Sequence, residues 1–506
     1  MKLKYIDNKL IIFVILVTIL FFLVLFSFFN FNFYGENINF SNYIESNDFV
    51  AGISSNGNYG AYDKNSHTYY FSKNVFDLHK IHIESSYKTK YKINQISDDE
   101  YNIYIYSAKY FQKRTIKLLN NSIISIDYFD ELGKHEPPNF NNLNIYDRQD
   151  INIVFRIMDN DYKKRFYNSN NFVEPAVLRV RGASSTLFPK KSFKIELSKK
   201  KSLLGMNEDD DWVLDALFMD KSKVRNLLSY SLWNRINDNQ NINNDLSGEF
   251  VEVFIDNEYD GLFVLKQKVG KKSVNVSDTG FLAKSVNHMT DNYLSELISP
   301  DIKFVDNGCK FVYGNLEMKY CTVDSLVNFK NKIRSYYGDN EFYTVDSNFD
   351  LNNYLNYYAF ISFISGVDNV TKNLYFSMID SSSKIIITPW DLDLTWGLDW
   401  ANTGELHSNF DMNLSANYEW LETNIISKFD EQTLSLLKQR YWELRKDVIT
   451  VNTINGYLNS YKELLVDSGA ASRDSERWYE YDVEYEIEQI REWASYRIQF
   501  LDEYFK

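Results

Sequence analysis

The chain has 506 residues, enough for about two to four structural units, at least one of them with a large core. Its 55 basic and 69 acidic residues give a formal net charge of −14. This charge argues against a nucleic-acid partner, because phosphate backbones require a basic surface. The sequence contains no P-loop, GxGxxG, GxSxG or HExxH motif, so it gives no support to those enzyme classes.

The first strong pattern along the chain is the apolar run Leu10–Phe29, twenty residues of which only two are polar. At about 1.5 Å per residue, the run matches a hydrocarbon core of roughly 30 Å. Three lysines precede it, and the next basic residue is Lys64. By the positive-inside rule we expect a cytoplasmic tail at 1–9, a single-pass transmembrane signal-anchor at 10–31, and a main domain outside the cytoplasm, at the cell surface.

The next part of the chain, residues 32–140, is predicted to be a β-rich accessory region. It opens with a polar and aromatic tether and continues with short alternating segments such as "YNIYIYSAKYF" and "SIISIDYF". The paired prolines of "GKHEPPNFNN" indicate a domain boundary, after which residues 145–506 form the large domain.

The large domain mixes strands and helices, so we predict an α+β fold. "PAVLRVRG" and "KSFKIELS" are predicted strands around a loop of small residues, and "EFVEVFIDNEYDGLFVLKQKV" is a predicted hairpin. "DKSKVRNLLSYSLWNRI" has the spacing of an amphipathic helix with Asp220 as N-cap. The carboxy-terminal part is helical and ends in "VEYEIEQIREWASYRIQFLDEYF".

Cys309 and Cys321 are the two cysteines of the chain. They flank a segment that can turn back at Tyr313-Gly314-Asn315. Outside the cytoplasm such a pair suits a disulfide that closes a small loop. Two buried free thiols are the alternative.

The most informative stretch is "SGVDNVTKNLYFSMIDSSSKIIITPWDLDLTWG". If "DSSS" is the turn of a hairpin, opposed residue numbers sum to 763, and Asn373 faces Trp390. Asp368, Asp391 and Asp393 then gather at the same end. Carboxylate oxygens together with an Asn carbonyl are ligands that Mg²⁺ and Mn²⁺ prefer. The alternative is that these residues only cap strands and turns.

The spacing of Asp368 and Asn373 favours the metal site. Protein kinases use Asp-x4-Asn for a catalytic Asp and a metal-binding Asn, and supply a second metal-binding Asp after a strand pair. Asp391 has that position here.

A phosphate-binding region is predicted in "LRVRGASSTLFPKKSFKIEL", where a loop of small residues between strands offers backbone amides. The candidate phosphate ligands are Arg181, Ser184, Ser185, Lys191, Lys194 and Arg225. A solvated basic hairpin, and a structural ion pair for Arg225, are the alternatives.

These stretches together resemble the CotH family of atypical kinases. The resemblance rests on "RGASSTLFPKKSFKIEL", "DDDWVLDALFMDKSKVRNLLSYSLW", "VEVFIDNEYDGLFVLKQKV", "DNVTKNLYF" and "PWDLDLTWG", and it covers about residues 145–500. It implies a kinase-like fold and transfer of the ATP γ-phosphate, with Mg²⁺ or Mn²⁺, to Ser or Thr hydroxyls of a protein acceptor or to an envelope glycan.

The resemblance also implies roles for individual residues. Asp368 would be catalytic, Asp391 the main metal ligand, and Asn373 and Asp393 further metal ligands. Gln267, a further predicted nucleotide- or phosphate-binding residue, stands where the family pattern tends to Glu. This is a departure, since a neutral amide there would weaken a contact with a lysine or a metal. A location outside the cytoplasm, where ATP is scarce, is a second departure.

Two other functions fit parts of the sequence. A non-catalytic surface adhesion module suits the anchor and the β-rich region, but it has no use for three acids and an Asn at one hairpin end. A carbohydrate-active hydrolase suits the tryptophans of "PWDLDLTWGLDW" with Asp399 or Glu405 as acids. A hydrolase function does not explain the lysine and arginine residues of the basic loop.

A reporter fused after Lys506 tests the topology. We expect a reporter that works only outside the cytoplasm to be active, because the three lysines hold the amino terminus inside. Activity of a reporter that works only in the cytoplasm would contradict the signal-anchor.

Overall fold

The computed structural model describes residues 43–46, 49–128, 149–161, 171–182, 184–237, 246–286, 312–313, 316–336, 348–370, 372–398, 426 and 429–506. They fall into two compact units. Unit 1 takes its described residues from 43–123, 158–160 and 171, and unit 2 takes the remainder. Leu10–Phe29, "GKHEPPNFNN" and Cys309 lie outside the described residues. In the part of the chain that is described, no helix reaches the length and apolarity of a membrane span.

Unit 1 is built from strands. A six-stranded sheet has the order β4-β5-β9-β8-β7 with β1 beside β9, and a three-stranded sheet has the order β3-β2-β6. The elements are β1 (Ile44–Glu45), β2 (Val50–Ser55), β3 (Asn58–Tyr59), β4 (Ala61–Asp63), β5 (Thr68–Ser72), η2 (Leu78–Lys80), β6 (Ile81–Ser85), β7 (Lys90–Ser97), β8 (Glu100–Tyr106) and β9 (Tyr110–Leu119).

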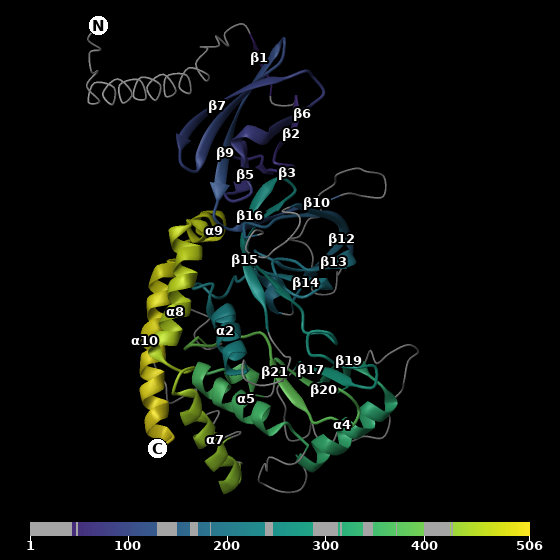
Figure 1. Ribbon diagram of the computed structural model, residues 1–506, viewed down its shortest axis with the longest axis vertical. Coiled ribbons are helices and arrows are strands. Elements are labelled where there is room, and N and C mark those ends of the chain that lie inside the picture. The colour runs from purple at the N-terminus through teal and green to yellow at the C-terminus, as the bar shows by residue number, and fades with distance from the viewer. Residues whose placement is uncertain are drawn as a thin grey trace, which may run out of the picture. The chain divides into compact units, whose positions relative to one another are not determined.

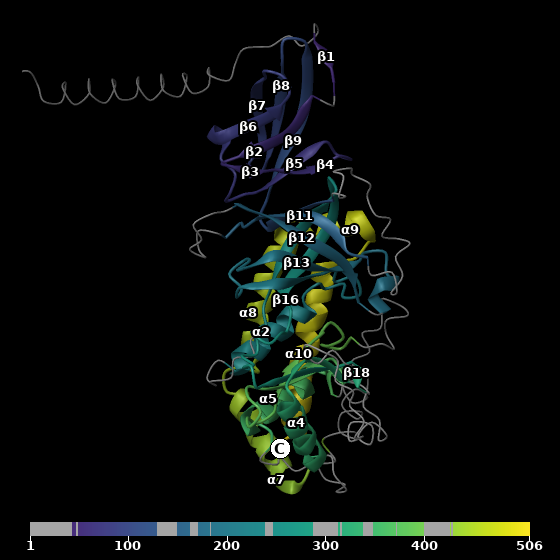
Figure 2. The same ribbon diagram turned by 90° about the vertical axis from the view of Figure 1, so that its right-hand side faces the viewer.

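Unit 2 begins with a closed barrel whose strand order is β10-β11-β12-β13-β14-β16-β15 (Figures 1 and 2). The strands are β10 (Ser122–Tyr128), β11 (Ile151–Met158), β12 (Asn171–Arg181), β13 (Ser192–Lys201), β14 (Asp209–Asp215), β15 (Gly248–Ile255) and β16 (Glu258–Gln267), with η4 (Ser184–Leu187) between β12 and β13. Alternate residues of these strands fill one buried core.

The first barrel strand differs from its prediction. "SIISIDY" was expected in the accessory region, but it is β10 and most of it belongs to unit 2. The alternation of polar and apolar residues in this strand suits either unit, so only its strand pairing decides to which unit it belongs. The Asp256 amide, in the β15–β16 turn, donates to the Ile126 carbonyl.

The two predicted hairpins of the barrel are confirmed. β12 pairs with β13, and β15 pairs with β16. Asp256 and Asn257 form the β15–β16 turn with φ of 50° and 60°. These are left-handed conformations that Asp and Asn tolerate better than most residues, so the sequence itself favours this tight turn.

A second core lies between α2 (Arg225–Asn237), a small sheet and several helices. The sheet has the order β18-β19-β17-β20-β21. Its strands and neighbouring helices are β17 (Phe281–Ser285), β18 (Val312–Tyr313), β19 (Leu316–Cys321), α4 (Val323–Tyr336), α5 (Leu351–Ile364), η5 (Val367–Asn369), β20 (Leu374–Met378) and β21 (Ile386–Pro389). The mixed helix and strand content agrees with the predicted α+β class.

The cysteines give a partial result. Cys321 ends β19, and no described cysteine is free. Since Cys309 lies outside the described residues, the disulfide remains a prediction.

The carboxy-terminal segment is helical, as predicted. It comprises α7 (Glu431–Leu444), α8 (Val451–Lys462), the π-helical turn η7 (Glu463–Asp467), α9 (Ala470–Trp478) and α10 (Val483–Tyr504). Helices α8 and α10 lie side by side, α9 packs on β16, and α7 packs on α5 (Figure 1). The segment therefore braces both the barrel and the second core of unit 2.

Asp474 of α9 makes the central contact between this helical segment and the barrel. Its carboxylate accepts from Lys190 Nζ at 2.6 Å, from the Leu262 amide at 2.8 Å and from the Tyr481 hydroxyl at 2.6 Å. Lys223 Nζ lies 3.8 Å away. Burial by itself raises the Asp474 pKa, but the two lysine charges outweigh it and lower the pKa.

Asp474→Asn should destabilise the protein by about 3–5 kcal/mol. The change leaves Lys190 and Lys223 buried without the carboxylate that pairs with both of them, and a poorly compensated buried charge is costly. The free energy of unfolding in urea is the measurement.

Glu484→Gln provides the matched control, because Glu484 pairs with Lys462 on the surface and is half exposed. Loss of that pair is expected to cost about 0–1 kcal/mol. Equal effects of the two substitutions would contradict the role of Asp474.

Candidate functional site

A cleft of about 480 Å³ lies within unit 2, between the barrel strands β12–β14 and the turns that flank β20 and β21. Its volume is in the usual range for small-molecule sites, roughly 300–1,000 Å³. The predicted site residues that line it are Arg181, Ser185, Lys194, Asp368, Asn373, Asp391 and Asp393. Residues from separate parts of the sequence thus meet in one cavity.

The hairpin register brings the metal-site candidates together. Leu374 pairs with Pro389, and the Trp390 amide donates to the Asn373 carbonyl at 2.9 Å. The predicted sum of 763 is therefore confirmed. Both Asn373 and Asp391 have left-handed backbones, with φ of 53° and 60°. Asn and Asp tolerate this conformation, which turns the chain sharply at the end of each strand.

Asp368 lies in the short helix η5 and is 8% exposed. Lys372 Nζ is 3.2 Å from its Oδ2 atom. Lys372 also lines the cleft, and sequence reasoning did not select it. The signal was present, because a lysine four residues after an acid within one turn region is placed to pair with it.

The acids beyond β21 crowd one another. Burial, then the charges of Asp391 and Asp215, raise the pKa of Asp393 from 3.8 to about 8. Asp215 itself has a lowered pKa: burial opposes ionisation, but Lys266 at 2.5 Å outweighs it. The same contact raises the pKa of Lys266 against the effect of burial.

The oxygen donors of Asp391, Asp393 and Asn373 suit Mg²⁺. Among the described residues, no three His, Cys, Asp or Glu side chains are grouped closely enough to hold a metal by themselves. Mg²⁺ is commonly bound by one or two carboxylates together with substrate phosphates and water, so this donor set fits it. The raised pKa of Asp393 is the effect that a nearby cation would reverse.

The barrel side of the cleft carries the basic residues. Arg181 ends β12, and Gly182 follows with φ of 119°. A Cβ at Gly182 would lie 1.9 Å from Ser185 Oγ, so only glycine allows this close loop. Lys194 is already paired, with Asp211 at 2.6 Å and with Glu196 at 3.1 Å. The side chain of Ser184 lies outside what the structure describes.

Sequence reasoning missed two further lysines. Lys266 of β16 reaches the Asp215 carboxylate, and its Nζ lies 4.8 Å from the centre of the Trp390 ring. Lys284 of β17 lines the cleft, and burial lowers its pKa to about 8. A strand lysine carries no local signal of what it faces, so only the three-dimensional fold identifies these two.

Among the predicted nucleotide- and phosphate-binding residues whose side chains are described, Lys191, Gln267 and Arg225 do not line the cleft. Lys191 is buried and donates to the Thr186 carbonyl at 2.7 Å. Gln267 donates to the Asn207 carbonyl at 3.3 Å and lies 3.4 Å from an Asp209 oxygen.

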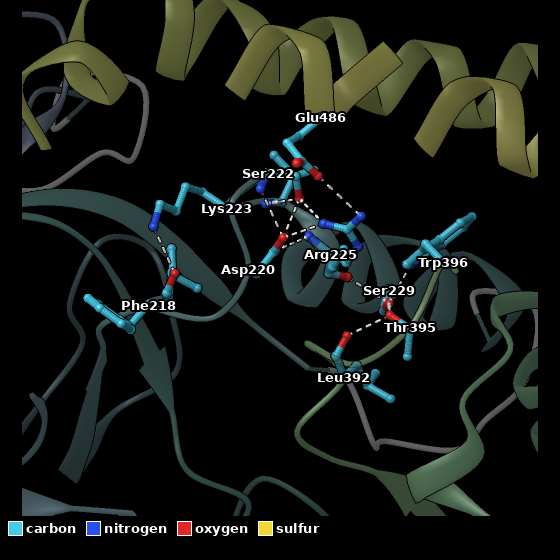
Figure 3. Close-up of polar contacts among 12 residues, drawn as sticks. Phe218, Asp220, Ser222, Lys223, Arg225, Ser229, Leu392, Thr395, Trp396 and Glu486 are labelled. Carbon is cyan, nitrogen blue, oxygen red and sulfur yellow. Dashed lines mark hydrogen bonds and ion pairs between the residues drawn. The ribbon is translucent and has the colours of Figure 1, made fainter. Parts of the chain in front are cut away.

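The third is Arg225, shown in Figure 3. It is 1% exposed, its Nη1 atom lies 2.6 Å from Asp220 Oδ1, and its Nη2 atom lies 3.6 Å from Glu486. Asp220 also accepts from the Arg225 amide, so it caps α2 from five residues away instead of as the adjacent N-cap. The geometry is that of the alternative interpretation, a structural ion pair.

Helix α2 also holds the loop after β21 (Figure 3). The Trp396 Nε1 atom donates to Ser229 Oγ at 2.8 Å, and Ser229 donates to the Arg225 carbonyl at 2.7 Å. Thr395 donates to the Leu392 carbonyl at 2.6 Å. These buried contacts fix the loop that carries Asp391 and Asp393.

A family model described as CotH kinase protein matches residues 178–501 of this chain. No curated protein matches this chain.

Asp393→Asn should stabilise the metal-free protein, with a gain that grows with pH. The pKa of Asp393 is about 8 in the folded chain and has an ordinary value of 3.8. Between these two pH values the folded chain therefore binds more protons than the unfolded chain. Its stability therefore falls as pH rises from about 4 to about 8. Because Asn does not titrate, the substitution removes this loss of stability. Urea unfolding in EDTA should show a gain about 1 kcal/mol or more larger at pH 9 than at pH 6.

Asp380→Asn, at the other end of the same hairpin, is the control. Hydrogen bonds from Ser382 and Ser383 lower the Asp380 pKa to about 2, so its contribution is constant between pH 6 and 9. A pH-independent effect of Asp393→Asn would contradict the raised pKa of Asp393.

Proposed function

Because the chain belongs to the CotH family, we propose that it transfers the γ-phosphoryl group of ATP to a Ser or Thr hydroxyl of a protein, or to an envelope glycan. One observation carries the proposal: the cleft gathers Asp368, Asn373, Asp391 and Asp393 opposite the basic loop at Arg181 and Ser185. Phosphoryl transfer needs this combination of a proton acceptor, metal-binding oxygens and phosphate-binding cations.

Asp368 is the proposed catalytic residue. Its carboxylate would orient the acceptor hydroxyl and take its proton as the hydroxyl oxygen bonds to the γ-phosphorus and the bond from that phosphorus to the leaving ADP breaks. Lys372 Nζ, 3.2 Å away, pairs with this carboxylate and is proposed to supply a positive charge beside the transferred group.

Asp391 is the proposed main metal ligand, with Asn373 and Asp393 beside it. Bound there, Mg²⁺ or Mn²⁺ would supply positive charge that offsets the phosphate charge repelling the nucleophile. The left-handed turns at Asn373 and Asp391 direct the chain so that both residues line the cleft. Asp393 loses its proton when it takes part, since its pKa is raised in the metal-free protein.

The phosphate groups are proposed to meet the opposite wall. Arg181 supplies a permanent positive charge, and Gly182 and Ser185 line the same wall, where backbone amides of their loop are proposed to donate to phosphate oxygens. Lys284 has a pKa near 8 because it is buried, and an anionic phosphate beside it favours its charged form.

The proposed setting is a membrane surface, with the amino-terminal segment as anchor and the cleft outside the cytoplasm. The run Leu10–Phe29 with its preceding lysines supports this topology. Such an enzyme draws on ATP outside the cytoplasm or in an organelle lumen, and its acceptor is an exported protein or a glycan.

Asp391→Asn and Asp368→Asn should separate nucleotide binding from chemistry. Asp391→Asn is expected to weaken Mg²⁺–ATP binding roughly tenfold or more and to abolish turnover, because a metal-binding charge is lost. Asp368→Asn should leave nucleotide binding nearly unchanged and lower kcat by about 10² to 10⁴. Nucleotide titration and transfer of labelled phosphate to a Ser-rich basic peptide are the measurements.

Asp380→Asn is again the matched control, since it removes an acid from the opposite end of the hairpin. It should retain both binding and turnover. If the unmodified chain binds neither ATP nor Mg²⁺, the kinase proposal fails and the surface adhesion module becomes the better function.

A further inference from the structure

Asn369 lies between the two turns that carry the proposed catalytic and metal-binding residues. It follows Asp368 directly in the short helix η5 and is fully buried. Its Nδ2 atom donates to the Trp390 carbonyl at 2.7 Å and to the Asn373 carbonyl at 3.0 Å. One amide group therefore binds the end of β21, immediately before Asp391, and the beginning of β20.

The orientation of this amide is fixed by its partners. Both acceptors are carbonyl oxygens, so the nitrogen and not the oxygen of the side chain must face them. The Oδ1 atom is buried and has no hydrogen-bond partner among the described residues. The Asn369 carbonyl accepts from the buried Tyr357 hydroxyl of α5, which holds the backbone. A buried oxygen without a partner is unfavourable, so the benefit of this side chain lies in its two donated bonds.

The bonds meet where the chain has unfavourable backbone conformations. Asn373 and Asp391 both have positive φ, and such residues keep this conformation only when their surroundings enforce it. The Asn369 amide binds the carbonyl of Asn373 and the carbonyl that precedes Asp391. Because Asp368 is its neighbour in sequence, the same side chain also fixes the turn at Asp368 relative to the turns at Asn373 and Asp391.

We propose that Asn369 is a positioning residue that sets the spacing between Asp368 and the metal-binding pair Asn373 and Asp391. The inference rests on the proposed function, and it assigns Asn369 no contact with substrate or metal. Loss of its amide should let the two turns separate, so that the metal-binding oxygens no longer converge. Metal affinity and kcat should fall while the acceptor still binds.

Asn369→Ala is the test variant, and Asn353→Ala is its control. Asn353 is equally buried and binds the same strand, since it donates to the Ile387 carbonyl at 3.0 Å and accepts from the Ile387 amide at 2.7 Å. The Asn353→Ala substitution therefore removes comparable hydrogen bonds from β21, away from the turns at Asn373 and Asp391.

The measurements are Mn²⁺ binding by electron paramagnetic resonance, thermal unfolding, and steady-state kinetics, all on the full-length chain. Asn369→Ala should weaken Mn²⁺ binding by roughly tenfold or more and lower kcat by a similar factor, with KM for the acceptor peptide within about twofold. Asn353→Ala should lower the Tm by a similar amount, with Mn²⁺ binding and kcat within about twofold of the unmodified chain.

The outcomes separate this inference from the proposed function. Wild-type Mn²⁺ affinity in Asn369→Ala would overturn the positioning role. Weaker Mn²⁺ binding in the variant, in a chain that transfers no phosphate at all, would support positioning and contradict the kinase proposal. Asn369→Ser, which keeps a single donor, is the second variant. If neither Asn369 variant folds while Asn353→Ala does, Asn369 is a structural residue and the inference is wrong.

Discussion

The buried carboxylate of Asp474 is the contact on which the arrangement of unit 2 depends. It neutralises Lys190, from the loop between β12 and β13, and Lys223, from the segment that leads into α2. That loop forms one wall of the cleft, and α2 holds the turn that forms the other wall. A single acid on a carboxy-terminal helix thus fixes both sides of a site to which the helix contributes no lining residue.

A second constraint is charge balance within the cleft. Asp393 is buried and lies near Asp391 and Asp215, and Lys266 offsets only part of this effect, so the pKa of Asp393 is raised to about 8. A protein selected for stability alone would not retain such repulsion. The cost is reasonable where a cation and anionic phosphates complete the site. The geometry and the electrostatics of the cleft therefore both support the proposed binding of a metal ion and phosphates.

The local elements could be predicted from sequence because their signals are local. Turn residues fixed the register of the β20–β21 hairpin, and that register placed Asn373 beside Trp390 and Asp391. Arg225 was less predictable, since the same buried cation suits a phosphate or an acid, and Asp220 is its partner only in the folded chain. The local sequence around Lys266, Lys284 and Asn369 does not show what their side chains contact. Their importance comes from strands and turns that meet only in the tertiary fold.

The pairing of Lys190 with Asp474 also has a consequence for synthesis. The two residues are 284 positions apart in the chain. During translation the barrel strands emerge long before α9. Until then the two lysines must either stay hydrated or be buried without the carboxylate that pairs with both of them. The barrel is therefore expected to close late, after the carboxy-terminal helices dock. Such dependence on a distant contact slows folding and leaves the early strands exposed to non-native pairing.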